Sequence, residues 1–229
     1  QRAFDQISTD VCINALPVTF LIDRAGLVGA DGVTHQGVFD LSYLSMLPNM
    51  VVAAPRDVRD LKRLIRLSAE YDGPMAIRYP KDGEDLGARL ETQKPLRVGE
   101  WELLSGGEDV LFFAVGRVVQ PAMNACIELM HHGVRAGVVD ARYVKPLDGD
   151  MLRASLKTPL WVTVEENVLS GGLGERVLAW LAKNAPGHAA MTLAVPDRFI
   201  EHAPVSSQLR QCGLDAEGLT ASVLGRLGR

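Results

Sequence analysis

The stretch that decides the fold is PVTFLIDRAGLVGADGVTHQG, residues 17–37. It begins with an apolar run over 17–22 and continues into a segment, 23–37, with four glycines, two aspartates, an arginine and a histidine. A short apolar run that ends at glycine-rich sequence is typical of a buried strand. In open α/β sheets the working residues lie just beyond the carboxyl ends of the strands. The pattern therefore predicts a strand that carries ionisable groups to a crevice.

The sequence around this stretch alternates between helix and strand. Predicted helices lie at 3–15, 40–47 and 56–71, and predicted strands lie at 18–22, 50–54 and 75–80. Strands that are apolar throughout and separated by amphipathic helices favour a parallel sheet covered on both faces. Residues 1–80 are therefore predicted to form a first α/β domain.

A change in composition separates this domain from a second one. Residues 81–96 are polar, contain glycine and proline and show no clean period, which indicates an inter-domain linker. Predicted strands then lie at 98–104, 109–116, 134–141, 160–166 and 191–195, and predicted helices at 118–133 and 171–184. The sequence thus predicts an α/β protein with a second α/β domain over 97–229.

Composition excludes several classes of protein. A net charge of −4 and an aromatic content of 6% argue against a nucleic-acid-binding surface. The three cysteines are far apart and form no C-x-x-C pair, so neither a disulfide framework nor a zinc site is indicated and a reducing cytoplasm fits. The sequence contains neither a long apolar run nor a signal peptide, which argues against a membrane span.

Three residues of the glycine-rich segment could perform chemistry. Arg24 offers a planar fork suited to a carboxylate or a phosphate. Asp31 and His35 could form a hydrogen-bonded pair that holds the imidazole in one tautomer and tunes its proton affinity. The structural alternative is a tight loop with solvated charges. The density of functional groups favours a site.

Two further arginines are candidates for anion binding. Arg78 ends the apolar strand AIRYP, where a buried guanidinium requires a partner. It could bind an anionic ligand, or it could form a core salt bridge with a nearby carboxylate. Arg2 could do either.

Several strings resemble one known family, the transketolase-like thiamine diphosphate enzymes. The similar strings are QRAFDQI, DRAGLVGADGVTHQGVFDLSYL, MVVAAPRD, GPMAIRYP, DARYVKPLD and VTVEENVLSGGLGERV. Within that family, DRAGLVGADGVTHQG is most similar to the 1-deoxy-D-xylulose-5-phosphate synthase branch. The resemblance covers essentially the whole chain. It implies that 1–80 are the C-terminal part of a pyrimidine-binding domain and that 97–229 are a transketolase-like C-terminal domain.

The resemblance also implies what lies elsewhere. The family's diphosphate-magnesium motif, Gly-Asp-Gly followed by Asn, does not occur here. The string DGD at 148–150 is a different sequence and lacks the context of the motif. The glutamate that activates the aminopyrimidine of the cofactor would lie upstream of Gln1. We therefore expect a fragment of a homodimeric enzyme in which thiamine diphosphate and Mg²⁺ are held mainly by an N-terminal portion. In this family the helix start SGGLGE, 170–175, is interpreted as close packing at a domain or subunit contact, although it could also bind an anion.

The implied reaction condenses pyruvate with glyceraldehyde 3-phosphate, releases carbon dioxide and supplies precursors for isoprenoids, thiamine and pyridoxal. By resemblance, His35 would handle protons at the intermediate and Asp31 would hydrogen-bond a sugar-like hydroxyl. Arg24 and Arg78 would hold the triose phosphate, and Arg2 would reach a carboxylate or phosphate. Two alternatives stay open: a β-type component of a 2-oxo acid dehydrogenase, and a non-catalytic assembly module.

Overall fold

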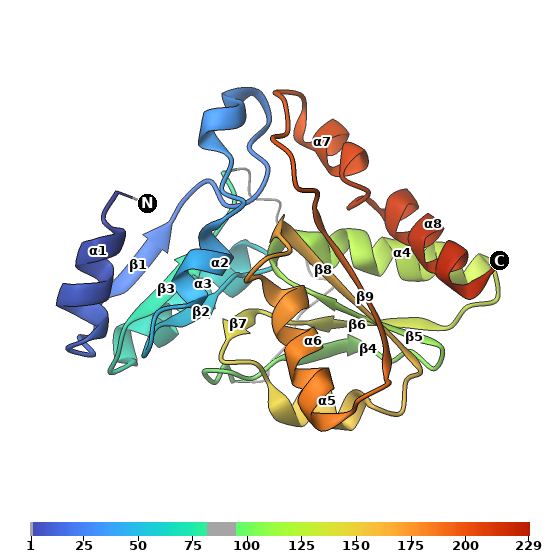
Figure 1. The fold of residues 1–229 in the computed structure, drawn as a ribbon, viewed down its shortest axis with the longest axis horizontal. Helices are drawn as coiled ribbons and strands as arrows, with labels where there is room; N and C mark the ends of the chain where they lie inside the picture. Colours follow the sequence, from blue (N-terminus) through green and yellow to red (C-terminus); the bar gives the residue numbers. More distant parts are fainter. Residues whose placement is uncertain (1, 82–94) are drawn as a thin grey trace.

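The computed structural model of the protein describes residues 2–81 and 95–229. It contains two sheets with the strand orders β1-β3-β2-β7 and β4-β6-β5-β8-β9. Figure 1 shows the smaller sheet beside the N-terminal helix and the larger sheet between helices on both of its faces. The prediction of an α/β fold is confirmed. Most of the predicted linker 81–96 lies outside the described residues.

The first sheet is built on the strand that precedes the glycine-rich segment. β1 (Thr19–Ile22) and β2 (Val51–Ala53) each pair in parallel with β3 (Met75–Arg78), which lies between them. The register places Ile22 opposite Arg78. The carboxyl ends of β1 and β3 therefore meet at one edge of the sheet, which is where functional residues are expected in such folds.

The fourth strand of this sheet comes from the second half of the chain. β7 (Tyr143–Lys145) pairs antiparallel with β2. The sequence analysis missed this strand, because three residues between charged and proline-rich sequence give no periodic signal. The first sheet is thus completed by residues beyond the predicted domain boundary.

The first half contains the helices α1, α2 and α3. α1 (Phe4–Gln6) continues into a π-helical turn over Ile7–Cys12, α2 is Asp40–Ser45 and α3 is Val58–Glu70. The side chain of Asp57 caps α3 by accepting the Asp60 N–H at 2.7 Å. An N-cap aspartate satisfies one of the amides that the first turn leaves without a helical partner.

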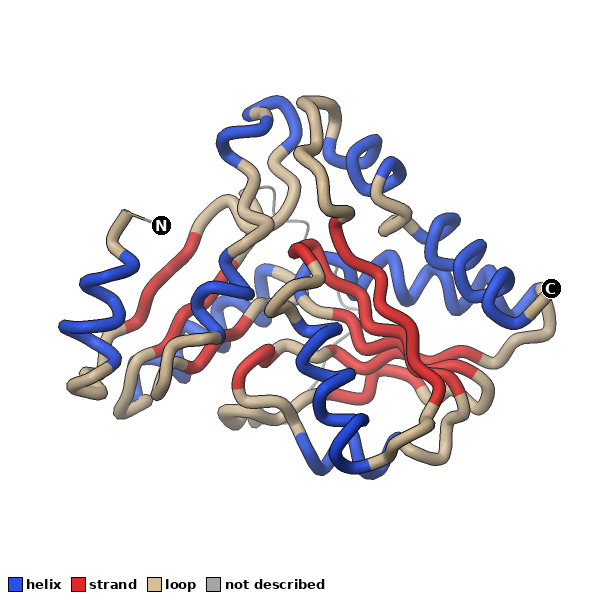
Figure 2. The backbone as a smooth tube through the Cα atoms, in the orientation of Figure 1, coloured by secondary structure: helices blue, strands red, loops and turns tan. Residues whose placement is uncertain are grey.

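The second sheet is parallel except for its edge strand β4. Its strands are β4 (Glu102–Ser105), β5 (Val110–Ala114), β6 (Ala136–Asp140), β8 (Leu160–Val168) and β9 (Ala189–Val195). Its helices are α4 (Val119–His131), α5 (Gly149–Ser155), α6 (Leu173–Asn184), α7 (Val205–Gln211) and α8 (Ala216–Leu227). In Figure 2 the strands of this sheet run side by side, with α4 and α8 on one face and α6 on the other. Among the described residues, no helix has the length and apolar character needed to cross a lipid bilayer.

Alternate residues of the central strand β5 enter two different cores. Phe112 packs with side chains of α4 and α8, whereas Phe113 packs with Trp161 and with α6. The core that contains Phe113 also contains Val52, Ala76 and Ile77 of the first sheet. The two halves therefore share one continuous apolar core.

A buried ionic cluster also joins the two halves. We call it the seam cluster; its members are Arg56 and Asp60 from the first half and Glu102, Asp140 and Arg142 from the second. Arg56 Nη1 lies 2.9 Å from Asp140 Oδ2, and Arg142 Nη2 lies 2.7 Å from the same oxygen. Burial, together with the charge of Asp140, raises the pKa of Asp60 to about 6.

The start of α6 binds a carboxyl group that the chain itself supplies. The Glu165 carboxylate accepts the N–H groups of Leu173 and Gly174, each at 2.8 Å. Gly172 permits this approach, because a Cβ there would lie 2.2 Å from Glu165 Oε2. The helix N-terminus favours negative charge, yet burial dominates and raises the pKa of Glu165 to about 7. SGGLGE is therefore a close internal packing site.

The raised pKa of Glu165 leads to a prediction of how the free energy of unfolding depends on pH. Unfolded Glu165 loses its proton near pH 4.5, whereas the folded carboxyl keeps it to about pH 7. The free energy of unfolding should therefore fall as pH rises through this window, by up to about 3 kcal/mol from this group. Urea unfolding at about pH 5 and about pH 8 should show a smaller difference for Glu165→Gln than for the unmodified chain. Equal differences in the two proteins would contradict the interpretation.

Candidate active site

The glycine-rich segment forms a loop that closes on itself after β1. The backbones of Gly26 and Gly37 exchange two hydrogen bonds, of 2.8 and 2.9 Å, at the neck of the loop. Gly37 is required here, because a Cβ would lie 2.2 Å from the Arg24 carbonyl oxygen. Beyond the neck the loop makes two tight turns, Gly29–Asp31 and Val33–His35. Figure 1 shows this loop rising above the first sheet next to the segment between β9 and α7.

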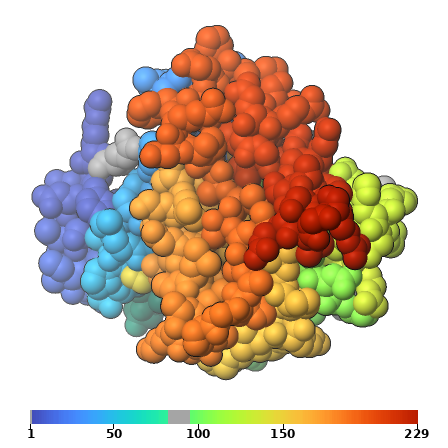
Figure 3. Space-filling view, turned by 45° about the vertical axis from the view of Figure 1, so that its right-hand side comes forward, coloured from blue at the N-terminus to red at the C-terminus, as the bar shows by residue number. Residues whose placement is uncertain are grey.

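The inner side of the loop is held by the second half of the chain. Glu166 Oε1 accepts the Leu27 N–H at 3.1 Å, and the buried Gln208 accepts the Gly29 N–H at 2.9 Å. Gln36 donates to the Ile200 carbonyl at 3.2 Å. In the space-filling view of Figure 3, the blue surface of the loop lies against the orange segment that follows β9. The second half of the chain therefore holds the inner side of the loop in place.

The outer side of the loop carries charged groups that remain partly exposed. Asp31 accepts a hydrogen bond from Lys81 Nζ at 2.7 Å and one from Arg24 Nε at 3.4 Å. These partners, Lys81 first, lower the pKa of Asp31, so its carboxyl is ionised at neutral pH. Arg24 and Lys81 each keep nearly half of their side-chain surface exposed. Two cations therefore flank one carboxylate at the carboxyl ends of β1 and β3.

The backbone at Arg24 has an unusual conformation. Its φ of +60° lies in the left-handed region, which non-glycine residues seldom adopt. The Arg24 N–H and its Nη1 both donate to the neighbouring Asp23 carboxylate, at 2.5 and 2.7 Å. Such conformations cluster at functional sites, where surrounding contacts hold them.

The predicted pair between Asp31 and His35 is wrong for the described structure. The His35 ring lies in an exposed turn, with Nδ1 3.0 Å from Thr34 Oγ1. The Asp31 carboxylate is instead taken by Lys81 and Arg24. Gly32, with φ +80° and ψ −174°, separates the turns that carry the two side chains.

Arg78 is buried and fully within the core. Its Nε donates to Asp40 Oδ1 at 2.8 Å, and its Nη2 donates to the carbonyls of Gly37 and Glu166 at 2.7 and 2.6 Å. The core salt bridge, which the sequence left open as the alternative, is therefore what this arrangement shows. Burial raises the pKa of Asp40, although Arg78 opposes this effect. Arg78 supports the neck of the loop from inside, and its contact with substrate stays a prediction.

Comparison with known proteins places this chain in a family. Residues 1–83 match the model described as the transketolase pyrimidine binding domain, and residues 99–219 match the transketolase C-terminal domain. The chain belongs to the transketolase family.

Individual relatives show which members of the family the chain is similar to. The chain is 46% identical to a 1-deoxy-D-xylulose-5-phosphate synthase of Aquifex aeolicus and 44% identical to one of Geobacter sulfurreducens, in each case over 97% of this chain. It spans only 36% and 35% of the length of these two relatives. A solved structure described as a split gene transketolase, an inactive beta4 tetramer, superposes with a TM-score of 0.88 at 31% identity and covers 98% of this chain and 71% of that one. These findings confirm the resemblance.

In this transketolase-family chain the remaining predicted site residue, Arg2, makes no contact with the others. It lies in an exposed turn ahead of α1 and has no hydrogen bond or ion pair with any other described residue. The structure does not bring it into contact with Arg24, Asp31 or His35. Its predicted role in anion binding stays a prediction.

Lys81 is the residue that sequence reasoning missed. The prediction placed it in the linker, yet its ammonium group contacts Asp31. A signal was present, because Lys81 follows RYP directly and the strands at 18–22 and 75–80 were predicted to belong to one parallel sheet. Parallel neighbours bring their carboxyl ends together, so the residue after β3 reaches the loop after β1.

Two observations concern the binding of a diphosphate and its metal ion by the described residues. These residues contain no group of three or more His, Cys, Asp or Glu side chains placed to hold a metal ion. The N-terminus of α6, which could otherwise bind a phosphate, is filled by Glu165.

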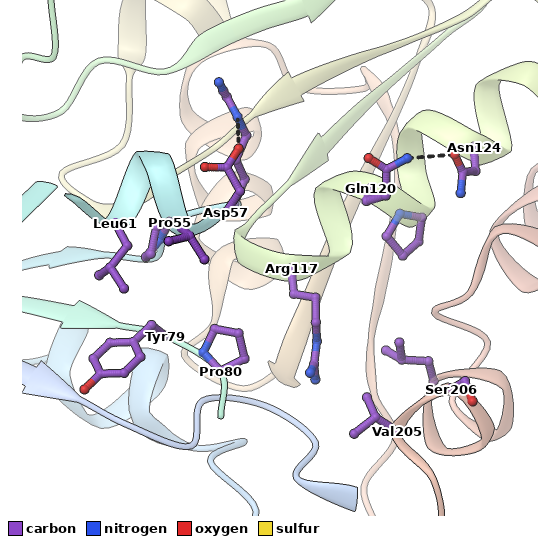
Figure 4. Close-up of a pocket in the computed structure, with 14 residues that line it drawn as sticks. Pro55, Asp57, Leu61, Tyr79, Pro80, Arg117, Gln120, Asn124, Val205 and Ser206 are labelled. Atoms are coloured by element: carbon purple, nitrogen blue, oxygen red, sulfur yellow. Dashed lines mark hydrogen bonds and ion pairs between the residues drawn. The ribbon is translucent and has the colours of Figure 1, made fainter. Parts of the chain in front are cut away.

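A cavity of about 360 Å³ lies at the seam between the two halves. Its walls include Pro55, Leu61, Tyr79, Pro80 and Val205. In Figure 4 the Arg117 side chain extends toward Pro80 and Val205 at one end of this cavity. None of the residues that the sequence predicted for the site lies in its walls, so the cavity is separate from the outer face of the loop.

Proposed function

We propose that this chain supplies the substrate-binding half of a thiamine diphosphate-dependent synthase. The proposed reaction condenses pyruvate with D-glyceraldehyde 3-phosphate to 1-deoxy-D-xylulose 5-phosphate and carbon dioxide. The family match and the identity to 1-deoxy-D-xylulose-5-phosphate synthases support this proposal. Because the chain spans about a third of those relatives, a complementary portion would hold the diphosphate and Mg²⁺.

The observation that carries the proposal is the charged outer face of the loop. Both substrates are anions, and Arg24 and Lys81 present two partly exposed cations at the carboxyl ends of adjacent strands. We propose that these cations bind the substrate phosphate, because guanidinium and ammonium groups form strong charge-assisted hydrogen bonds with such anions. The ionised Asp31 would accept a hydrogen bond from a substrate hydroxyl.

His35 is proposed to move the proton. Thr34 contacts its Nδ1, so Nε2 can face a ligand placed over the loop. An imidazole at this position would exchange a proton with the hydroxyl that forms when the new carbon–carbon bond is made. The cofactor, when bound by the complementary portion, would supply the electron sink for decarboxylation.

Several finer properties belong to the same proposal. We propose a homodimeric assembly in the cytoplasm, with Mg²⁺ bound outside this chain, in the synthesis of isoprenoid precursors, thiamine and pyridoxal. The split-gene transketolase that superposes on this chain is described as an inactive tetramer of its β chain. That description fits our proposal that the present chain needs its complement for activity.

Labelled pyruvate tests this function. The chain joined to or mixed with its N-terminal portion should convert labelled pyruvate and D-glyceraldehyde 3-phosphate into labelled 1-deoxy-D-xylulose 5-phosphate, detected by mass spectrometry. The chain alone should neither form product nor show tight, Mg²⁺-dependent binding of thiamine diphosphate in calorimetry. An assembled enzyme that transfers an acetyl group to lipoamide instead would favour the 2-oxo acid dehydrogenase alternative.

A further inference from the structure

Two residues of the second half form hydrogen bonds with the backbone of one residue of the loop, Leu27. Glu166 Oε1 accepts the Leu27 N–H at 3.1 Å, and Arg117 Nη2 donates to the Leu27 carbonyl at 3.0 Å. Arg117 Nε donates to Glu166 Oε2 at 3.0 Å, and Arg117 Nη2 also contacts Glu166 Oε1. The two side chains and the Leu27 backbone therefore form a closed hydrogen-bonded ring.

This ring is largely buried at the join between the loop and the second sheet, although the Arg117 side chain keeps 19% of its surface exposed. Glu166 is 2% exposed and lies near the end of β8, while Arg117 comes from the turn between β5 and α4. Because the pair is largely shielded from water, its hydrogen bonds are stronger than they would be on the surface. Gly26 leaves room for it, since a Cβ at Gly26 would lie 2.7 Å from Glu166 Oε1.

The same ring is linked to the neck of the loop. The Glu166 carbonyl accepts a hydrogen bond from Arg78 Nη2, and that same nitrogen donates to the Gly37 carbonyl. Glu166 thus contacts Leu27, in the segment that enters the loop, through its side chain. Through Arg78 it is also linked to Gly37, in the segment that leaves the loop. Arg24 precedes Leu27 by three positions, and Asp31 follows it by four.

We propose that Glu166 and Arg117 are positioning residues for the substrate-binding face of the loop. They touch neither substrate nor cofactor in this account, which rests on the proposed function of the outer face. They set the place of Arg24, Asp31 and His35 relative to the second half of the chain. Misplacement of such groups by about 1 Å can lower catalytic efficiency about 100-fold.

Substitutions with a matched control test this proposal in the assembled enzyme. Glu166→Gln keeps the side-chain shape but removes the charge opposite Arg117, and Arg117→Lys keeps the charge but loses the planar fork. Both should raise the KM for D-glyceraldehyde 3-phosphate, lowering kcat/KM about 10- to 100-fold. The control is Glu165→Gln, an equally buried neighbour whose carboxylate binds α6 and not the loop. Its KM should equal that of the unmodified enzyme.

Hydrogen exchange separates positioning from general stability and from the proposed reaction. In the 229-residue chain, Glu166→Gln should make the amides of Leu27 and Gly29 exchange about 10-fold faster or more, while Glu165→Gln leaves them unchanged. Unchanged protection in Glu166→Gln, or an equal KM effect in the control, would overturn the proposal. If the unmodified assembly forms no product, the proposed function fails, and the exchange result still decides whether the pair orders the loop.

Discussion

Replacing His35 by alanine in the assembled enzyme should lower kcat about 100- to 10,000-fold, the range that a positioned acid–base group supplies. The side chain is exposed, and its described hydrogen bond joins its Nδ1 to the Thr34 hydroxyl at 3.0 Å. Its removal should therefore change the free energy of unfolding by less than about 0.5 kcal/mol. The affinity for thiamine diphosphate should stay the same, because the proposed function assigns the diphosphate and Mg²⁺ to the complementary portion.

Steady-state kinetics and calorimetry on the same preparation check this expectation. Thr34→Ala is the matched variant, because it removes the hydroxyl beside His35 Nδ1 and leaves the imidazole in place. It should reduce kcat far less than His35→Ala does. Unchanged turnover in His35→Ala would remove the imidazole from the mechanism.

The second large effect is on stability and concerns the seam cluster. Replacing Asp140 by alanine removes the carboxylate that Arg56 and Arg142 share, at 2.9 and 2.7 Å. Breaking a buried ion pair by removing one partner costs about 3–5 kcal/mol, because charge stays buried without full compensation. Asp140 is completely buried, so solvent screening does not reduce this value.

Urea unfolding measures this loss. Asp150→Ala is the control, since Asp150 forms an exposed pair with Arg153 and should change the free energy of unfolding by less than about 1 kcal/mol. Because Arg56 and Asp140 come from different halves that also share a core, we expect one cooperative transition in both proteins. A loss in Asp140→Ala no greater than in the control would show that the seam cluster does not hold the halves together.

Local sequence patterns predicted most of the fold because both sheets consist of apolar strands separated by amphipathic helices. β7 was not predicted because it is short and because its strand conformation depends on pairing with β2 rather than on its own composition. The same limit explains the shared core, since no local pattern reports that Ile77 and Phe113 belong to one cluster.

The position of the glycine-rich loop after β1 was predicted from the sequence, but the contacts of its charged residues were not. Glycine spacing marked the loop after β1, and the resemblance supplied roles for Arg24, Asp31 and His35. Which carboxylate pairs with which cation depends on distant residues, as the contact of Lys81 with Asp31 shows. The hydrogen bond between Glu166 and Leu27 joins residues 139 positions apart, a separation at which sequence spacing carries no information about contact.

The most direct test of the central claim is how well the enzyme distinguishes a phosphorylated acceptor. We would measure kcat/KM for D-glyceraldehyde 3-phosphate and for unphosphorylated D-glyceraldehyde in the assembled enzyme and in Arg24→Gln. Arg97→Gln serves as the control, because Arg97 is an exposed arginine that pairs with Glu100 away from the loop. A charge-assisted hydrogen bond contributes about 1.5–3 kcal/mol, so Arg24→Gln should lower the ratio of the two values about 10- to 150-fold. A ratio equal to that of the unmodified enzyme would contradict the claim that the outer face of the loop binds the substrate phosphate.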